Sequence, residues 1–328
     1  MPSLTEAQRA SFLKRFPGAK LDEPMSAHTY LKIGGPAQLF LLTDNPDDLV
    51  SAIKAAKELE IPWFVMGGGS NLLVSDDGYK GLIIQSADTT FNVRERTVVA
   101  SAGALTALVA RTAADAGLRG FEWGAGLPGT IGGAIFGNSG CFGGEMRNSV
   151  VTVDCYEIAT GKRIILPNVE CKFGYRDSRF QHEALIILKT VLALKPGGKV
   201  EELKKKITEI MSQRQAAQPK GKFSAGCMFK NFDFKTDAEL EILKRQVSEI
   251  PEDMLKNKRL GAGWLIDQVG LKSTTIGQAQ VSENHANFIV NLGGARAQDI
   301  LQLTSLVKMK VRDELGILLE DEVRLVGF

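Results

Sequence analysis

Hydrophobic and polar positions along the chain follow two spacings, one typical of helices and one typical of strands. Asn45-Pro46-Asp47-Asp48 opens a segment with helical spacing through about Leu59, with a capping residue, a proline in the first turn and acidic residues at the positive helix end. The apolar run from Ile61 to Met66 predicts a buried strand. The pattern then predicts strands at 91–93 and 97–102, on either side of a charged turn, and a helix at 105–116. The first half therefore alternates strand and helix.

The second part of the chain has a mixed α/β pattern of its own. Glycine is concentrated in the first half, whereas residues 200–257 are rich in Lys and Glu, and the turn-forming cluster Lys195-Pro196-Gly197-Gly198 lies between them. We therefore predict a domain boundary near this cluster. Beyond it, the spacing predicts helices at 200–215, 237–250, 259–269 and 297–315, and strands at 287–292 and 319–326. The 328 residues suffice for about two or three domains with separate cores.

Composition and charge argue against several classes of protein. The chain is 44% hydrophobic and 24% charged, as in ordinary globular proteins. Its 40 basic and 38 acidic residues give a net charge of +2, and the basic residues are dispersed, so we expect no nucleic-acid partner. No segment approaches the roughly 20 uncharged apolar residues that span a bilayer, and the first residues do not resemble a signal peptide. We expect a cytoplasmic protein with no membrane partner.

The cysteines and histidines do not have the spacing of a metal site. No C-x-x-C pair occurs, and no two histidines stand at i and i+4. We expect reduced thiols and no bound metal. The residues concerned are Cys141, Cys155, Cys171, Cys227, His28, His182 and His285.

Two glycine-rich segments are candidates for binding a cofactor. Gly67-Gly68-Gly69 follows a predicted strand, but Leu72-Leu73-Val74 continues as a β-type run, so the strand-loop-helix context of a Rossmann fingerprint is absent. Consecutive glycines let backbone N–H groups approach an anion, although a tight turn would also explain them. The segment from Gly124 to Ala134 is so dense in glycine that backbone packed against a flat or phosphorylated ligand is favoured. Together the segments favour a dinucleotide cofactor.

Seven short motifs occur in an order that is known from one enzyme family. The chain resembles the UDP-N-acetylenolpyruvoylglucosamine reductases from about Thr29 to Phe328. The motifs are GGGSNLLVSD at 67–76, GLPGTIGGA at 126–134, GYRDSRF at 174–180, AGCMFKN at 225–231, AGWLIDQVGLK at 262–272, HANFIVN at 285–291 and LEDEVRLVG at 319–327.

This resemblance implies an α+β fold with an FAD-binding region of the vanillyl-alcohol-oxidase type. It implies an N-terminal segment at 1–33, an FAD-binding domain at 34–196 made of two subdomains (about 34–100 and 101–196), a substrate-binding domain at 197–316, and a closing strand at 317–328 that returns to the FAD domain. FAD is bound without a covalent link in this family, which agrees with the absence of His and Cys from both glycine segments. NADPH is the implied hydride donor, UDP-N-acetylglucosamine enolpyruvate the substrate, and a monomer the expected state.

The implied chemistry needs three kinds of protein group. Hydride reaches the enolpyruvyl methylene carbon, negative charge develops on the neighbouring carbon and the carboxylate, and an acid then protonates the carbanion. Arg176 matches the family's catalytic arginine, and a guanidinium stays charged and donates in a planar fork. Glu322 matches the catalytic glutamate, and strand alternation would place it with Glu320 and Arg324 on one face. Taken alone, these residues would be read as a surface salt bridge and a solvated edge strand.

Cys227 lies where the family pattern has a serine that donates the proton. A thiol with an ordinary pKa of about 8.5 is a stronger acid than a serine hydroxyl, so a cysteine can fill this role. A buried thiol acting as a small hydrophobe is the alternative.

The resemblance also implies the residues that bind the cofactor and the substrate. The implied cofactor-binding residues are Gly67, Gly68, Gly69, Ser70, Asn71, Leu72, Gly126, Pro128, Gly129, Gly132, Gly133, Ala134 and Arg324. The implied substrate-binding residues are Tyr175, Lys230, Asn231 and His285, for each of which a structural hydrogen bond is the alternative.

Departures from the family leave two other functions open. The usual Lys-Asn-Pro appears as Lys230-Asn231-Phe232, and the usual Asn-Thr near the start appears as His28-Thr29. A hydroxy-acid or sugar oxidase would share the glycine segments but not the set of Arg176, Cys227 and Glu322. A flavin-binding protein without activity is the second alternative, and the cysteine at 227 is the feature that favours it.

Overall fold

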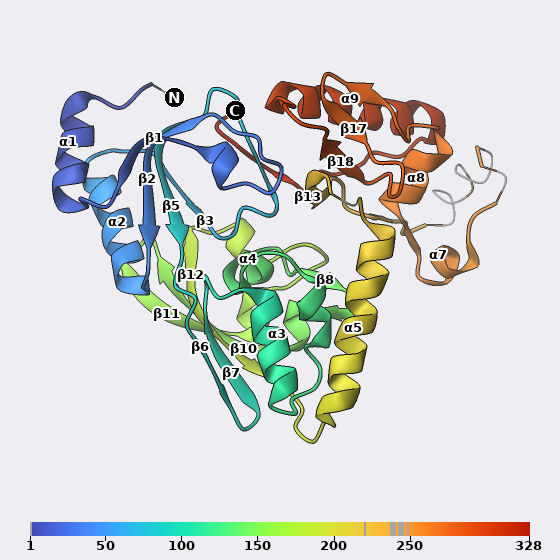
Figure 1. Cartoon of the computed structure of the whole chain (residues 1–328), viewed down its shortest axis with the longest axis horizontal. Helices are drawn as coiled ribbons and strands as arrows, with labels where there is room; N and C mark the ends of the chain where they lie inside the picture. The colour runs from blue at the N-terminus through green and yellow to red at the C-terminus, as the bar shows by residue number, and fades with distance from the viewer. Residues whose placement is uncertain (1, 220, 237–240, 242–245, 248) are drawn as a thin grey trace. The chain divides into compact units, whose positions relative to one another are not determined.

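The computed structural model describes residues 2–219, 221–236, 241, 246–247 and 249–328. The chain divides into two compact units, each built from three separate segments (Figure 1). Unit 1 comprises Met1–Glu23, Ala37–Gly69 and Lys80–Ala216, and unit 2 comprises Pro24–Pro36, Ser70–Tyr79 and Ala217–Phe328.

The first sheet of unit 1 has four strands in the order β1-β2-β5-β3, with β3 parallel to β5. The side chain of Asn45 accepts a hydrogen bond from the N–H of Asp48 and caps α2, as its sequence predicts. Leu49 and Ile53 of α2 are buried in the same core as Phe12 of α1. The bounds are α1 Glu6–Arg15, β1 Lys20–Pro24, β2 Pro36–Thr43, α2 Pro46–Glu58, β3 Trp63–Met66 and β5 Tyr79–Ser86.

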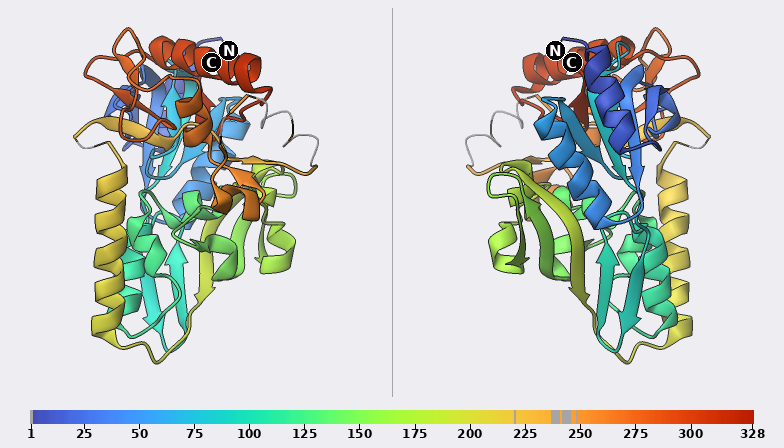
Figure 2. Two further views of the ribbon diagram at one scale, coloured as in Figure 1. Left: turned by 90° about the vertical axis from the view of Figure 1, so that its right-hand side faces the viewer. Right: turned by 90° about the vertical axis from the view of Figure 1, so that its left-hand side faces the viewer.

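The second sheet of unit 1 has five antiparallel strands in the order β11-β10-β12-β7-β6. Helices α3, α4 and α5 share a hydrophobic core with it, and Figures 1 and 2 show α5 beside α3. The bounds are β6 Phe91–Arg94, β7 Thr97–Ser101, α3 Thr106–Asp115, α4 Ile131–Phe136, β10 Val150–Glu157, β11 Lys162–Pro167, β12 Leu185–Ala193 and α5 Val200–Ala217. Shorter elements are η2 Glu122–Gly126, β8 Gly140–Cys141, β9 Gly144–Glu145, η3 Met146–Asn148, η4 Asn168–Cys171 and η5 Arg179–Gln181.

Helix α5 belongs to unit 1, although the boundary predicted near residue 197 assigns it to the second domain. Leu203 and Ile207 are buried in the core of the five-stranded sheet. The Lys and Glu residues of this helix lie on its exposed face, so the composition of the helix does not indicate which core its apolar face joins.

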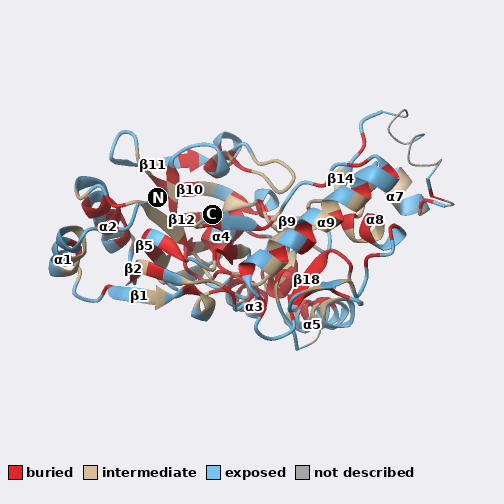
Figure 3. Cartoon of the chain, turned by 90° about the horizontal axis from the view of Figure 1, so that it is seen from above, coloured by how far each residue is buried: buried red, intermediate tan, exposed pale blue. Residues whose placement is uncertain are grey.

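Unit 2 contains an antiparallel sheet in the order β13-β18-β17-β16. Helix α9 runs from Ala297 to Leu315, as its spacing predicts, and buries Ile300, Leu303, Val307 and Val311 on one side. Figure 3 shows that the helix carries both buried and exposed residues. The bounds of the other elements are η1 Met25–Ala27, β4 Leu72–Val74, β13 Phe223–Cys227, β14 Phe232–Asp233, α7 Glu252–Lys256, β15 Arg259–Leu260, α8 Ala262–Gln268, β16 Thr275–Ile276, β17 Ala279–Val281, β18 Phe288–Asn291 and β19 Arg324–Val326. Across the described residues, no helix has the length and apolar character needed to cross a membrane.

Residues 70–79 are held in unit 2 although their neighbours on both sides belong to unit 1. The Asp76 carboxylate accepts hydrogen bonds from the N–H groups of Ala297 (2.8 Å) and Gln298 (3.2 Å) and so caps α9. Strand β4 pairs in parallel with β19. The predicted FAD-binding domain of 34–196 contains this segment, which in the structure belongs to unit 2.

Three predicted elements have different outcomes in the structure. The helix predicted at 259–269 is shorter, because Arg259–Leu260 pairs with β14 as β15. The strand predicted at 319–326 is wrong over most of its length, because only Arg324–Val326 is a strand. Most of the helix predicted at 237–250 falls outside the described residues.

Candidate active site

The two glycine-rich segments of unit 1 pack against each other. A Cβ atom added to Gly67 would lie 2.3 Å from Oγ1 of Thr130, and one added to Gly68 would lie 3.3 Å from Cα of Gly129. Strand β4 follows the first segment, so the predicted absence of a Rossmann strand-loop-helix is confirmed. Gly67 thus packs on the side chain of Thr130 and Gly68 on the backbone of Gly129, so the absence of a Cβ atom at 67 and 68 lets the two segments approach closely.

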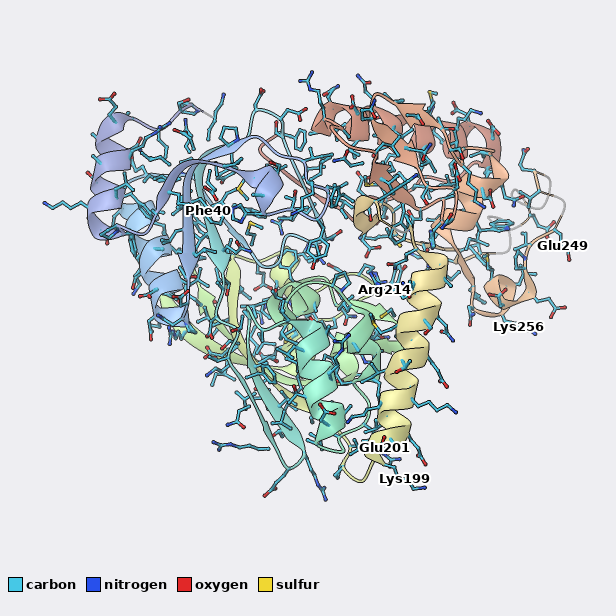
Figure 4. The ribbon with its side chains drawn as sticks, in the orientation of Figure 1. Phe40, Lys199, Glu201, Arg214, Glu249 and Lys256 are labelled. Carbon is cyan, nitrogen blue, oxygen red and sulfur yellow. The ribbon has the colours of Figure 1, made fainter. Side chains whose placement is uncertain are left out.

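Packing within the protein explains part of the glycine density. A Cβ atom at Gly132 would lie 2.8 Å from Cβ of Ala102, and one at Gly126 would lie 3.0 Å from Cγ2 of Ile210 on α5. The carbonyl of Gly126 also accepts a hydrogen bond from Arg214, which extends from α5 (Figure 4). Gly133, by contrast, is exposed and has no such close neighbour. Glycine density alone is therefore a weaker indicator of a ligand than the contact between the two segments.

We expect Gly67→Ala to lower the midpoint of thermal unfolding, because the new methyl group would overlap Oγ1 of Thr130. Overpacking of this kind lowers the free energy of unfolding by about 1–3 kcal/mol. For a unit of this size, each kcal/mol lowers the midpoint of thermal unfolding by about 2–4 °C. In a Thr130→Ala background the nearest remaining atom would be Cβ at 3.5 Å, so the added methyl group should cost much less. An equal loss in both backgrounds, measured by thermal melts of all four proteins, would contradict this contact.

Arg176 lies in a tight turn of unit 1. The N–H of Gly174 donates to the carbonyl of Asp177 over 2.9 Å, and Arg176 occupies the left-handed region with φ of 51°. Residues other than glycine rarely adopt this backbone conformation, which costs of order 1 kcal/mol and is typical of functional positions. The guanidinium Nη2 donates to the carbonyl of Gly140 over 2.9 Å, and Cζ lies 5.4 Å from the ring centroid of Tyr175. Both predicted residues of this turn are therefore held in a defined geometry.

Cys227 lies at a bulge in β13 of unit 2. Ser224 pairs with Val290 and Cys227 pairs with Phe288, so two residues of β13 stand opposite one residue of β18. Gly226 within this bulge has φ of 86°, a conformation that glycine adopts without steric cost. A bulge re-aims the side chain beside it, and Cys227 is half-buried rather than buried in the core. The predicted alternative of a core thiol does not fit this position.

Backbone pairing brings Glu322 beside the Cys227 segment. The N–H of Glu322 donates to the carbonyl of Met228 over 2.8 Å, and the N–H of Lys230 donates to the carbonyl of Glu320 over 2.9 Å. This short antiparallel pairing lies within the predicted strand, and β19 begins only at Arg324. The residues predicted to donate a proton and to act as the catalytic glutamate thus lie on adjacent segments of one unit.

Asn287 fixes the segment that follows Cys227. The residue is 2% exposed. Its side chain accepts a hydrogen bond from the N–H of Phe229 (2.9 Å) and donates one to the carbonyl of Phe229 (2.8 Å). Its own carbonyl accepts from the N–H of Met228 over 2.7 Å. Sequence reasoning did not assign a role to Asn287, although it lies inside the motif at 285–291.

We expect Asn287→Ala to lower the free energy of unfolding by about 2–5 kcal/mol, because both polar backbone groups of the buried Phe229 would lose their partner. Asn287→Asp should cost at least as much, since one carboxylate oxygen can still accept from the N–H but the other would face the carbonyl of Phe229 at a buried position. Asn284→Ala, at an exposed position three residues earlier, is the matched control and should be within about 0.5 kcal/mol of wild type. Similar stability of the alanine variants at 287 and 284 in denaturant titrations would argue against this role.

The predicted substrate-binding residues of unit 2 surround the same segment. His285 Nδ1 accepts from the N–H of Asn287 (3.3 Å), its ring packs edge-on against Phe288, and burial lowers the pKa of its imidazole. The ammonium of Lys230 lies 3.3 Å from a carboxylate oxygen of Glu320. Asn231 Oδ1 accepts from the N–H of Ala262 at the start of α8 (3.1 Å), so this residue has the structural hydrogen bond that was its alternative explanation.

Some predicted cofactor-binding residues belong to unit 2 and lie close to Glu322. The side chain of Asn71 donates to the carbonyl of Glu322 over 2.9 Å, and the carbonyl of Asn71 accepts from the N–H of Arg324 over 3.1 Å. Leu72 pairs with Arg324 across β4 and β19. Ser70 precedes this group, whereas Pro128 and Ala134 lie in the second glycine segment of unit 1.

The remaining thiols differ from Cys227 in burial or surroundings. Cys155 and Cys171 are fully buried in unit 1, and burial raises the pKa of Cys155 to about 12 and that of Cys171 to about 11. Burial also raises the pKa of Cys141, against the opposing influence of Arg214 and Arg176. The Cys141 thiol donates to the carbonyl of Trp123 over 3.4 Å.

Two family models match the chain. Residues 37–166 match the FAD binding domain, and residues 218–326 match the C-terminal domain of UDP-N-acetylenolpyruvoylglucosamine reductase. The first range contains both glycine segments, and the second contains Cys227 and Glu322.

Whole-length relatives agree with both family models. The reductase of Caldanaerobacter subterraneus subsp. tengcongensis is 36% identical over 94% of this chain and 93% of its own length, and that of Heliobacterium modesticaldum is 38% identical over 93% and 90%. The crystal structure of the reductase from Thermus caldophilus superposes with a TM-score of 0.71 at 33% identity, covering 94% of this chain and 98% of that one. The predicted α+β fold with an FAD-binding domain is confirmed, and the chain belongs to the UDP-N-acetylenolpyruvoylglucosamine reductase family.

Proposed function

We propose that the protein is an FAD-containing reductase that uses NADPH to convert UDP-N-acetylglucosamine enolpyruvate to UDP-N-acetylmuramate, a precursor of bacterial peptidoglycan. The observation that carries this proposal is the backbone pairing that sets Glu322 beside the Cys227 segment in unit 2. An oxidase of the same cofactor type has no need for a proton donor and a carboxylate arranged in this way.

The residues proposed to hold FAD are those that match the family's cofactor-binding motifs. They are Gly67, Gly68, Gly69, Ser70, Asn71, Leu72, Gly126, Pro128, Gly129, Gly132, Gly133, Ala134 and Arg324. When bound, FAD accepts hydride from NADPH and supplies it to the enolpyruvyl methylene carbon. The match of residues 37–166 to the FAD binding domain supports this assignment, because that range contains both glycine segments.

Each proposed catalytic residue has one task. The guanidinium of Arg176 stabilises the negative charge that develops on the substrate carboxylate and the adjoining carbon. The thiol of Cys227 donates its proton to that carbon and completes the reduction of the double bond. Glu322, on the segment paired with 228–230, helps to orient the substrate, and Tyr175, Lys230 and His285 contribute to binding it.

The proposal is tested by following flavin absorbance without oxygen. Addition of NADPH should bleach the absorbance, subsequent addition of UDP-N-acetylglucosamine enolpyruvate should restore it, and the product should be heavier by two hydrogen atoms. Recovery with oxygen but not with the enolpyruvyl substrate would indicate an oxidase. A protein that binds flavin but is not bleached by NADPH would indicate the non-catalytic alternative.

A further inference from the structure

A buried asparagine of unit 1, Asn138, contacts both the turn that carries Arg176 and the β8–β9 hairpin whose carbonyl accepts from the Arg176 guanidinium. Asn138 follows the C-terminal end of α4 and is 0% exposed, with φ of 40°. Its Nδ2 donates to the carbonyl of Gly174 over 2.7 Å, at the first residue of the turn that carries Arg176. One side chain thus reaches from α4 to the backbone of that turn.

The same side chain holds the hairpin formed by β8 and β9. Nδ2 of Asn138 also donates to a carboxylate oxygen of Glu145 (2.9 Å), and Oδ1 accepts from the N–H of Arg147 (3.0 Å). This hairpin supplies the carbonyl of Gly140 that accepts from the Arg176 guanidinium. The hairpin is tight, because a Cβ atom at Gly140 would lie 2.4 Å from the carbonyl oxygen of Gly144.

The opposite end of the turn is tied to α4 as well. The hydroxyl of the fully buried Ser178 donates to the carbonyl of Phe136 over 2.6 Å. Gln181 Nε2 donates both to this carbonyl (3.1 Å) and to the carbonyl of Arg176 (3.0 Å). The turn is therefore held at its first residue by Asn138 and after its last residue through Phe136.

We propose that Asn138 is a positioning residue for Arg176, an inference that rests on the proposed function. Asn138 sets both the backbone of the turn at Gly174 and, through Glu145 and Arg147, the hairpin whose Gly140 carbonyl receives the guanidinium. Arg176 occupies a backbone region that a side chain rarely adopts, so surrounding contacts must hold it there. A charged group that stabilises a transition state loses much of its effect when displaced by about 1 Å.

The geometry of Asn138 determines which variants are informative. Asn138→Gly removes the side chain without new strain, because glycine tolerates the positive φ that alanine would not. Asn138→Asp keeps the shape and the acceptor for Arg147 but places an oxygen against both the carbonyl of Gly174 and the carboxylate of Glu145, so it should displace the turn and the hairpin. Thr190→Val is the control for loss of a buried hydrogen bond elsewhere in unit 1, where the hydroxyl donates to the carbonyl of Thr152 over 2.8 Å.

The experiment measures the two half-reactions of the FAD-loaded protein separately. In stopped flow at saturating substrate, Asn138→Gly and Asn138→Asp should slow the recovery of flavin absorbance by about 10- to 100-fold. They should leave bleaching by NADPH within about twofold, and Thr190→Val should leave both steps within about twofold. In an Arg176→Ala background, the same changes at residue 138 should slow recovery by less than about threefold, because residues that act as a unit are not additive.

The outcomes separate this inference from the proposed function. Equal slowing by the changes at residue 138 with and without Arg176, or equal slowing of both half-reactions, would overturn the positioning role. Wild-type protein that does not recover its flavin absorbance with the enolpyruvyl substrate would instead overturn the proposed function.

Discussion

Replacing Cys227 with alanine should slow the recovery of flavin absorbance by the enolpyruvyl substrate about 10²- to 10⁴-fold, the usual contribution of a positioned general acid. Bleaching by NADPH should stay within about twofold of wild type, because no proton is needed from Cys227 in that step. Stopped-flow measurement of the two steps distinguishes this result from a general loss of folding. Unchanged turnover of the enolpyruvyl substrate by Cys227→Ala would remove Cys227 from the mechanism.

Cys227→Ser provides the matched control. Serine is the residue that the family pattern has at this position, so this variant should keep substantial activity. It should lose the sensitivity to alkylating reagents that we expect of the wild-type protein. Cys141→Ser should leave that sensitivity in place, because burial raises the pKa of Cys141 and suppresses its reactive thiolate. Cys155 and Cys171 are fully buried, and burial raises their pKa values to about 12 and about 11. If Cys141→Ser lost the sensitivity to alkylating reagents and Cys227→Ser kept it, the reactive thiol would be Cys141.

Replacing Arg176 with alanine should slow the same step about 10²- to 10³-fold, the usual cost of removing a group that stabilises developing negative charge. Arg176→Lys should recover only part of this loss, because an ammonium lacks the planar pair of donors. Arg176→Gly should be as inactive as the alanine variant but more stable by about 1 kcal/mol, since glycine relieves the positive φ.

These three variants separate chemistry from backbone strain at one position. The rates come from stopped flow and the stabilities from thermal melts of the same preparations. A glycine variant less stable than the alanine variant would contradict the strained turn. Full activity of any of the three would contradict the assignment of Arg176 as the residue that stabilises charge.

The sequence predicts the regular elements of this protein well where the signals are local. The cap at Asn45 and the periodic apolar face of 297–315 lie within the elements they specify, so α2 and α9 appear as predicted. The pairing of residues 228–230 with 320–322 has no such local signal, because its two segments are about 90 residues apart. The alternating polar residues at 320–324 therefore resembled one long strand.

The assignment of Arg176, Cys227 and Glu322 to the site stays a prediction from the ordered motifs. No sequence pattern indicated the local geometry around them, namely the turn at 174–177 and the bulge at Gly226. Asn138 and Asn287 were missed because a buried asparagine bonded to backbone has the same sequence appearance as one in a surface turn. Their roles depend on which distant carbonyl and N–H groups face them, which only tertiary structure determines.

The segment 70–79 has a consequence for how unit 2 folds. Its Asn71 contacts the backbone of Glu322, a residue 251 positions further along, and its Asp76 caps α9. During synthesis, β4 leaves the ribosome long before β19, so β4 cannot pair with β19 until almost the whole of the remaining chain has been made. Closing so long a loop makes this pairing a late event in folding. The unit that carries Cys227 and Glu322 is therefore completed last, and a continuous fragment beginning at residue 217 would lack the strand and the helix cap that complete it.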